Sequence, residues 1–161
     1  MAIEIKPEPL TADRFAPFGD VLDFSGTPDK MINQDMCGRF HDRAVLTHTD
    51  GRAGISLFEA VPRQLPYRLD MMERHPFGSQ AFLPMTASPF LVIVAHDENG
   101  CPRQPVAFLT EPNMGVNYHA NIWHGVLTPL YVPGRFVVID RIGPGTNLEE
   151  HWFDESFVIV A

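Results

Sequence analysis

The sequence predicts an all-β jelly roll, built as one domain of short strands with one or two short helices. The length of 161 residues is that of a single domain. Fifteen prolines and twelve glycines interrupt the chain too often for long helices. Between these breaks lie short runs rich in Val, Ile and Phe at close spacing, which are typical of a sandwich or a closed barrel. We therefore treat residues 1–161 as one domain.

Each element follows from a local signal. Thr11 is a potential N-cap, which predicts a short helix near residues 11–16, and a helical turn is expected near residues 147–151. The segment DENG at residues 97–100 predicts a hairpin turn. An apolar tail at the C-terminus must pair with its own sheet or with another subunit, which is one reason to expect a dimer. Strands are expected at residues 55–61, 67–75, 80–85, 90–96, 105–110, 136–141 and 157–160.

The charge balance restricts the partners. Twenty acidic residues against twelve basic ones give a net charge of −8, and no cluster of Lys and Arg is present. This pattern argues against a nucleic-acid partner. A small anionic substrate would meet a repulsive overall field, so its site needs an arginine nearby.

The ends and the cysteines predict the compartment. The start, MAIEIKPEPL, lacks a basic segment followed by an apolar one, and the longest apolar run, residues 90–95, is too short to span a membrane. Cys37 and Cys101 lie far apart, without the spacing of a zinc site or a disulfide framework. We expect a cytoplasmic protein with reduced thiols and no membrane partner.

Polar residues interrupt the strand expected at residues 67–75. Side chains alternate along a strand, so Glu73 and His75 continue an inward face that begins Tyr-Leu-Met, whereas Arg74 points away. The turn that follows returns Gln80 to the same cavity. If residues 115–127, GVNYHANIWHGVL, are extended, His124 also points with an apolar set.

Two interpretations of these residues are open. Each histidine alone is most simply a core or surface residue with satisfied hydrogen bonds. Two histidines on apolar faces, with a carboxylate and an amide oxygen beside them, form a set that holds a divalent transition metal. His75, His124, Glu73 and Gln80 are therefore the candidate metal ligands.

Several motifs resemble the ureidoglycolate lyase family, bacterial enzymes of allantoin degradation in purine catabolism. They are ERHPFGSQAFLP, GVNYHANIWH and IDRIGPGTNLEE, together with INQ and RFHD between Ile32 and Asp42. The resemblance implies a cupin-like barrel, usually a homodimer, that cleaves the C–N bond of (S)-ureidoglycolate to glyoxylate and urea. It also implies nickel or a similar divalent metal.

The resemblance carries over to individual positions. Where the family often has a second histidine and a proline after the WH pair, this chain has Gly125 and Val126, and Ala120 stands where the family can carry arginine. A tandem histidine therefore has no role here. The matching site positions are Glu73, His75, Gln80 and His124, and further motif positions are Asn33, Arg39, His41, Asn117, Tyr118, His119, Asp140, Arg141 and Asn147.

The reaction assigns roles to these residues. Glu73 is either a metal ligand or the general base, and His119 can protonate the departing urea nitrogen. Arg39 is the first candidate for binding the substrate carboxylate and Arg141 the second, with Asn33, Asn117 and Tyr118 as further substrate contacts. We expect Arg74 to be structural.

Two alternatives to the lyase stay open. One is an amidohydrolase that releases ammonia from the same substrate, which would need a metal-activated water. The other is a cupin-type binding module without catalysis. It is favoured by Gln80, which stands where the cupin pattern has a glutamate ligand, and by Gly125.

Overall fold

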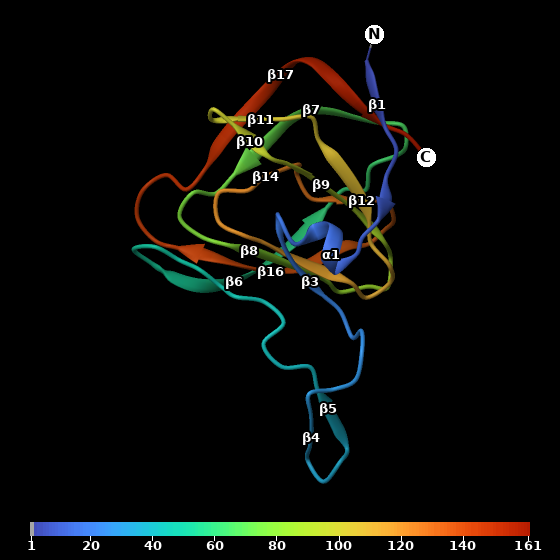
Figure 1. The fold of residues 1–161 in the computed structure, drawn as a ribbon, viewed down its shortest axis with the longest axis vertical. Coiled ribbons are helices and arrows are strands. Elements are labelled where there is room, and N and C mark those ends of the chain that lie inside the picture. The colour runs from blue at the N-terminus through green and yellow to red at the C-terminus, as the bar shows by residue number, and fades with distance from the viewer. Residues whose placement is uncertain (1) are drawn as a thin grey trace.

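The computed structural model describes residues 2–161, whose two main β-sheets pack against each other (Figure 1). One sheet has eight strands, in the order β1 (Ile3–Ile5), β17 (Glu149–Ile159), β7 (Tyr67–Arg74), β14 (Trp123–His124), β9 (Phe90–Ala95), β12 (Val106–Leu109) and β2 (Glu8–Pro9), with β15 (Thr128–Pro129) also paired to β9. The other has five, in the order β3 (Gly19–Leu22), β13 (Gly115–Tyr118), β8 (Gln80–Pro84), β16 (Gly134–Ile142) and β6 (Arg52–Ala60). The predicted cupin-like all-β architecture is confirmed.

The core explains why β9 is apolar along its whole length. Phe90, Val92 and Val94 belong to the cluster that fills the space between the sheets, whereas Leu91 and Ile93 belong to a second cluster on the opposite face of the strand. A strand that is buried on both faces loses the alternation of apolar and polar residues. The longest apolar run in the sequence therefore marks the centre of the eight-stranded sheet.

The predicted helix is present and short. Helix α1 spans Ala12–Phe15, and the Thr11 side chain accepts a hydrogen bond from the backbone N–H of Arg14 at 3.4 Å. Phe15 is fully buried in the core between the sheets. No helix of the described residues is long and apolar enough to cross a membrane.

The helical turn predicted near residues 147–151 is wrong, because strand β17 begins at Glu149. Residues Glu149–Trp152 pair in register with β7, and this pairing outweighs the weak local preference for a turn. Strand β17 continues to Ile159 and pairs with β1 as well. The C-terminal tail is thus paired within its own sheet, so it gives no support for a dimer.

The DENG hairpin is confirmed. Strands β10 (Asp97–Glu98) and β11 (Cys101–Pro102) are antiparallel, and the turn between them places Asn99 and Gly100 at φ values of 55° and 84°. Both residue types tolerate this left-handed region. The two cysteines of the chain, Cys37 and Cys101, are free and exposed.

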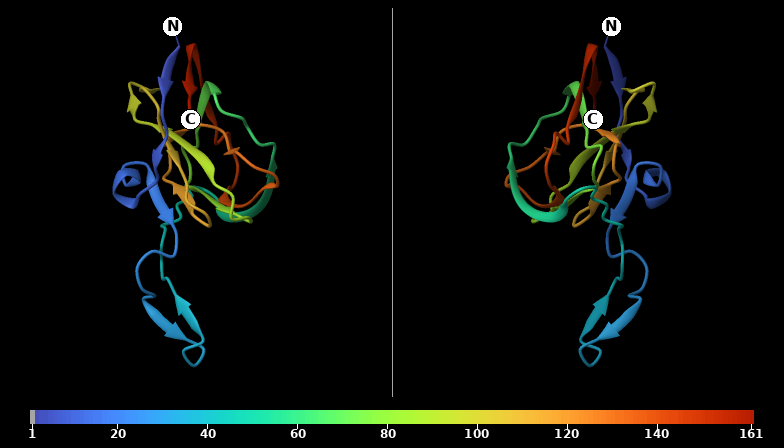
Figure 2. Two further views of the ribbon diagram at one scale, coloured as in Figure 1. Left: turned by 90° about the vertical axis from the view of Figure 1, so that its right-hand side faces the viewer. Right: turned by 90° about the vertical axis from the view of Figure 1, so that its left-hand side faces the viewer.

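Residues 24–46 form an arm that extends away from the barrel (Figure 2). Its two strands, β4 (Lys30–Ile32) and β5 (Cys37–Arg39), pair only with each other among the described residues. Phe24 and Met36 expose 71% and 85% of their surfaces. The sequence analysis did not predict this element.

Candidate active site

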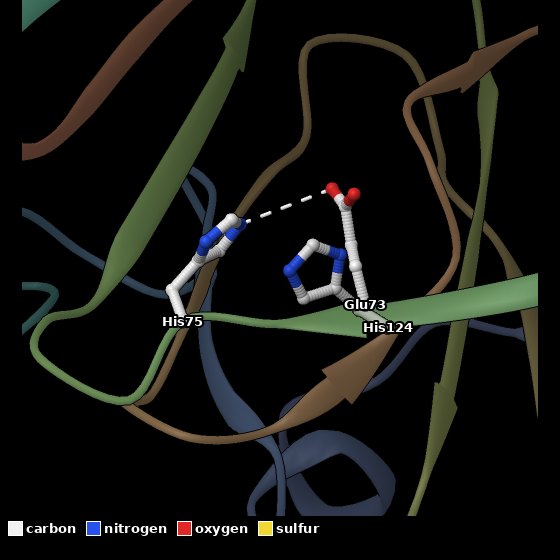
Figure 3. Close-up of side chains that lie close together, drawn as sticks. All are labelled: Glu73, His75 and His124. Carbon is white, nitrogen blue, oxygen red and sulfur yellow. Dashed lines mark ion pairs between the residues drawn. The ribbon is translucent and has the colours of Figure 1, made fainter. Parts of the chain in front are cut away.

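Three predicted residues meet where β7 ends beside β14. Glu73 and His124 are directly paired across these antiparallel strands, so their side chains project from the same face of the sheet. His75 follows the last residue of β7 and turns back toward them (Figure 3). Glu73 Oε1 lies 3.8 Å from His75 Nε2, and the rings of His75 and His124 are 5.2 Å apart between centroids.

Hydrogen bonds fix the orientation of both imidazoles. His75 Nδ1 lies 2.7 Å from the carbonyl oxygen of Asn147, and His124 Nδ1 lies 2.9 Å from that of Gly125. A carbonyl only accepts, so each neutral ring carries its proton on Nδ1 and keeps a lone pair on Nε2. Both Nε2 atoms are buried and have no hydrogen-bond partner among the described residues. The described residues therefore satisfy only one of the two nitrogens of each ring.

The three side chains fit a divalent transition metal. One ligand atom from each of Glu73, His75 and His124 lies within 4.8 Å of the others. Ligands bound at about 2.1 Å to one ion are roughly 3 to 4 Å apart, so a small inward movement would complete the set. Carbonyl oxygens that hold the remote nitrogen of a ligating histidine are a recurrent feature of metal sites. Two imidazoles and one carboxylate leave further coordination positions open.

Burial sets the charge states of this cluster. Desolvation raises the pKa of Glu73, with the neighbouring Glu150 adding to the effect and His75 opposing it. Desolvation, together with repulsion from His75, lowers the pKa of His124 to about 3. His124 is therefore neutral near pH 7 and available as a ligand, and Glu73 is a stronger base than an exposed glutamate.

The five-stranded sheet supplies the opposite wall. Tyr118 on β13 stacks on His124 with 4.4 Å between ring centroids and 6° between the planes. Gln80 on β8 is the cross-strand partner of Tyr118, so its side chain lies on the same face. Gln80 Nε2 donates to Asp140 Oδ2 on β16 at 3.2 Å, while Gln80 Oε1 is buried without a partner among the described residues. Gln80 thus shares a face with Tyr118, and its role as a metal ligand stays a prediction.

His119 and Asn117 lie on a neighbouring cluster around Asp20. His119 Nε2 is 3.2 Å from Asp20 Oδ1, and Asn117 Nδ2 donates to Asp20 Oδ2 at 2.9 Å. The side chain of His119 is 45% exposed, whereas Asn117 is fully buried. Sequence reasoning missed Asp20, because nothing in the segment around Gly19 distinguishes it from an ordinary surface aspartate.

The arginines are engaged in different ways. Arg141 is buried and donates to the carbonyl oxygens of Thr49, Asp50 and Pro144, which is a structural role. Arg74 bridges Asp97 and Glu149 and lies 4.4 Å from the centroid of the Trp123 ring, which agrees with the structural role expected for it. Arg39, together with Asn33 and His41, is exposed on the arm.

Strand β7 is packed on the side that carries Arg74 as well. Met72 lies on this side and is fully buried in the second core cluster. Leu69 belongs to the same cluster, so it does not share the face of Glu73 as simple alternation predicts. The alternation is interrupted between Leu69 and Met72, where the pairing with β17 shifts in register. Both faces of β7 are thus packed, and Glu73 occupies the inner one.

Comparisons with known proteins point to one family. A model of the ureidoglycolate lyase family matches residues 2–160. The chain is similar to the ureidoglycolate lyase of Rhodobacter capsulatus, at 59% identity over 89% of this chain and 90% of the relative. It is 48% identical to the ureidoglycolate lyase of Mesorhizobium japonicum, with 96% of both chains covered. It is 47% identical to ureidoglycolate lyase 2 of Rhizobium meliloti, with 98% of both covered.

Proposed function

The chain belongs to the ureidoglycolate lyase family, and we propose that it cleaves (S)-ureidoglycolate to glyoxylate and urea at the cluster of Glu73, His75 and His124. The observation that carries this proposal is the convergence of two buried Nε2 lone pairs and one carboxylate, with neither nitrogen bonded to the described protein. Such a set is costly to bury unless a ligand completes it.

The reaction requires two proton movements and no water. The central carbon of ureidoglycolate bears a hydroxyl, a carboxylate and a urea nitrogen. The hydroxyl loses its proton and its oxygen forms the aldehyde of glyoxylate as the C–N bond breaks. The bonding electrons pass to the urea nitrogen, which gains a proton. The site therefore needs a base near the hydroxyl and a proton donor near the nitrogen.

Glu73 is the proposed base. Its pKa is raised by burial, which brings it closer to the working pH and makes the carboxylate a better proton acceptor. The neighbouring His75 ring would attract the Glu73 carboxylate whenever the ring is protonated. A carboxylate oxygen of Glu73 lies within 4.8 Å of a ring nitrogen of both His75 and His124. The proton acceptor is therefore next to the residues that would orient the substrate.

His75 and His124 would hold a divalent metal, with Glu73 as a third ligand when it is not acting as the base. Gln80, the fourth ligand expected from the sequence, has an unpartnered Oε1 that is available either to this ion or to the substrate. Nickel is the ion that the family resemblance suggests. When bound, such an ion lowers the pKa of a coordinated hydroxyl group. The carbonyl oxygens of Asn147 and Gly125 orient the rings of His75 and His124 for this role.

His119 is the proposed acid for the urea nitrogen. Its Nε2 lies 3.2 Å from Asp20 Oδ1, a contact that fixes the direction of the ring. The ring is nearly half exposed, which leaves it free to exchange protons with solvent. Asn117 donates to the same carboxylate and limits the rotation of Asp20. Asn117 and Tyr118 are adjacent on β13, so Asn117 projects from the face opposite to the one on which Tyr118 stacks on His124.

Arg39 is the proposed contact for the substrate carboxylate, and it lies on the arm. The arm extends away from its own barrel, so its residues would reach the site of a second copy. Strand β6, nine residues long, is an edge of the five-stranded sheet and exposes 75% of Ile55 and 73% of Leu57. A long apolar edge favours pairing with another chain. These features support the homodimer, which we place in the cytoplasm.

The reaction is tested by incubating the pure protein with racemic ureidoglycolate, with and without a chelator. The expected products are glyoxylate and urea in equal amounts, formed from one enantiomer only. Ammonia in place of urea would identify an amidohydrolase, and ligand binding without turnover would identify a binding module. Either result would overturn the lyase.

A further inference from the structure

We propose that Asp140 is a positioning residue that fixes the amide of Gln80, so that Gln80 Oε1 accepts a hydrogen bond from the terminal amino group of the ureido moiety. The inference rests on the proposed function, because it names the group that recognises the urea half of the substrate. It concerns the five-stranded sheet, which faces the histidines of the opposite sheet.

Strand register brings the two side chains together. Gln80 is paired with Tyr118 on one side, and Ala81 is paired with Ile139 on the other, which puts Asp140 next to Gln80. Val138, two residues before Asp140, is buried in the core between the sheets, so Asp140 also points inward. Tyr118, Gln80 and Asp140 thus form a row on the inner face, and the Tyr118 ring joins this row to His124.

The contact with Asp140 decides which way the Gln80 amide points. An ionised carboxylate only accepts hydrogen bonds, so the group 3.2 Å from Asp140 Oδ2 must be the amino group of the amide. The oxygen is then turned away from Asp140. It is buried, and it has no partner among the described residues. Because a buried acceptor without a partner is unfavourable, Gln80 Oε1 is held ready for a ligand donor.

Urea chemistry selects the donor. The nitrogen that leaves the carbon must gain a proton, so it needs a proton donor beside it. The terminal amino group keeps both of its N–H bonds throughout and needs only acceptors. The proton gained by the leaving nitrogen offsets the electron pair that it takes from the C–N bond, so the terminal amino group stays a neutral donor. An acceptor at this group therefore recognises the ureido moiety in the substrate and in the transition state alike.

The proposal can be tested by binding, apart from turnover. Ureidoacetate carries the ureido group and the carboxylate but lacks the hydroxyl, so it has no route to cleavage. N-acetylglycine is its near-isostere in which a methyl group replaces the terminal amino group. Calorimetric titration of both ligands into the metal-loaded protein gives a selectivity ratio, and we expect the wild type to favour ureidoacetate by about tenfold.

Two variants separate the roles. Gln80→Met keeps the length of the side chain and removes the acceptor, so the selectivity ratio should fall to about one. Asp140→Asn lets the Gln80 amide reverse, because an amide both donates and accepts, and the ratio should fall severalfold. Combining the two changes should have no more effect than Gln80→Met alone, since Asp140 acts through Gln80. Asp70→Asn is the control, because Asp70 bonds Ser156 and Arg68 instead.

A direct titration with Ni²⁺ identifies the competing role for Gln80. Weakened nickel binding in Gln80→Met, with an unchanged selectivity ratio, would show that Gln80 is a metal ligand and would overturn the proposal. A wild-type ratio near one would also overturn it. The lyase assay on the wild type is separate, so its failure would count against the proposed function even where ureidoacetate selectivity is retained.

Discussion

The interior between the sheets and the arm differ in how they are held. Glu73, His75 and His124 are fixed by strand pairing and by hydrogen bonds to neighbouring carbonyls. The arm contains two short strands that pair only with each other among the described residues. An isolated two-stranded hairpin is marginally stable in water. The chain itself thus preorganises the first region, whereas among the described residues the second has only one pair of short strands.

Removing an interior group should have the largest effect. We expect Glu73→Gln and His124→Ala each to lower kcat at least ~100-fold, because each removes a proton acceptor or a ligand while the surrounding strands stay paired. The measurement is steady-state formation of glyoxylate and urea, with folding checked by circular dichroism. Glu59→Gln, on the exposed ion pair with Arg135, is the control. Wild-type rates in either interior variant would refute the site.

Acid should destabilise the interior through His124. Its pKa is depressed to about 3 in the folded protein, so its contribution to stability is present above the unfolded value of 6.5 and is lost as the pH falls from there toward 3. In chelator-treated protein, the free energy of unfolding in urea should fall with decreasing pH, with a slope up to ~1.4 kcal/mol per pH unit steeper than in His124→Gln.

Glu73 has the opposite effect on the pH dependence of stability. Its folded pKa is raised, so its stabilising contribution is present below its unfolded pKa and is lost as the pH rises through the folded value. Relative to the wild type, Glu73→Gln should therefore be more stable at neutral pH than at low pH.

His41→Gln, on the exposed arm, is the matched control for His124→Gln. Equal slopes for the wild type and His124→Gln would contradict the assignment of a buried neutral imidazole.

The arm can be tested by mixing two defective variants. We expect Arg39→Ala to lower kcat/KM about 10- to 100-fold through loss of a charge-assisted contact with the substrate carboxylate. If the arm acts on a second copy, subunit exchange between Arg39→Ala and His124→Ala should restore activity, because mixed dimers contain one intact site. Random exchange makes half of the dimers mixed, which gives about one quarter of wild-type activity. An inactive mixture would show that the arm does not act on the second copy.

Arg74 should show the smallest effect on chemistry, although it is next to Glu73 in sequence. Arg74→Ala removes two ion pairs and a contact with the Trp123 ring on the outer face of the sheet. We expect a loss of about 1 to 2 kcal/mol in the free energy of unfolding and a kcat within a factor of two of the wild type. A kcat loss comparable with that of Glu73→Gln would mean that the two faces of β7 are not independent.

The sequence could predict the parts of the site that lie within a single strand. Alternation along residues 67–75 separates Glu73 from Arg74, and the apolar neighbours of His124 place it inside. Contacts between residues of different strands could not be predicted. The contact of Gln80 with Asp140 depends on β8 lying beside β16, and Arg141 is sequestered by carbonyls from two loops. Local patterns contain no information on such pairings.

The arm escaped prediction for a different reason. Its turn consists of Asn33, Gln34 and Asp35, all in the left-handed region at φ values of 55°, 59° and 63°. Asn and Asp tolerate this conformation, but Gln does so less readily, and no glycine marks the turn. The flanking strands are only three residues each, and they contain a lysine, a glycine and an arginine, which weakens the apolar signal of a strand.

The place of β17 has a consequence for the order of folding. Strand β17 lies between β1 and β7, so the first and last strands of the chain are parallel neighbours, with Ile3 opposite Phe157 (Figure 1). Contacts between such distant segments require closure of nearly the entire chain and form slowly. During synthesis, the strand that carries Glu73 therefore lacks one neighbour until residues 149–159 have left the ribosome. Assembly of the site is a late event, and a chain released before that point would expose the edge of β7.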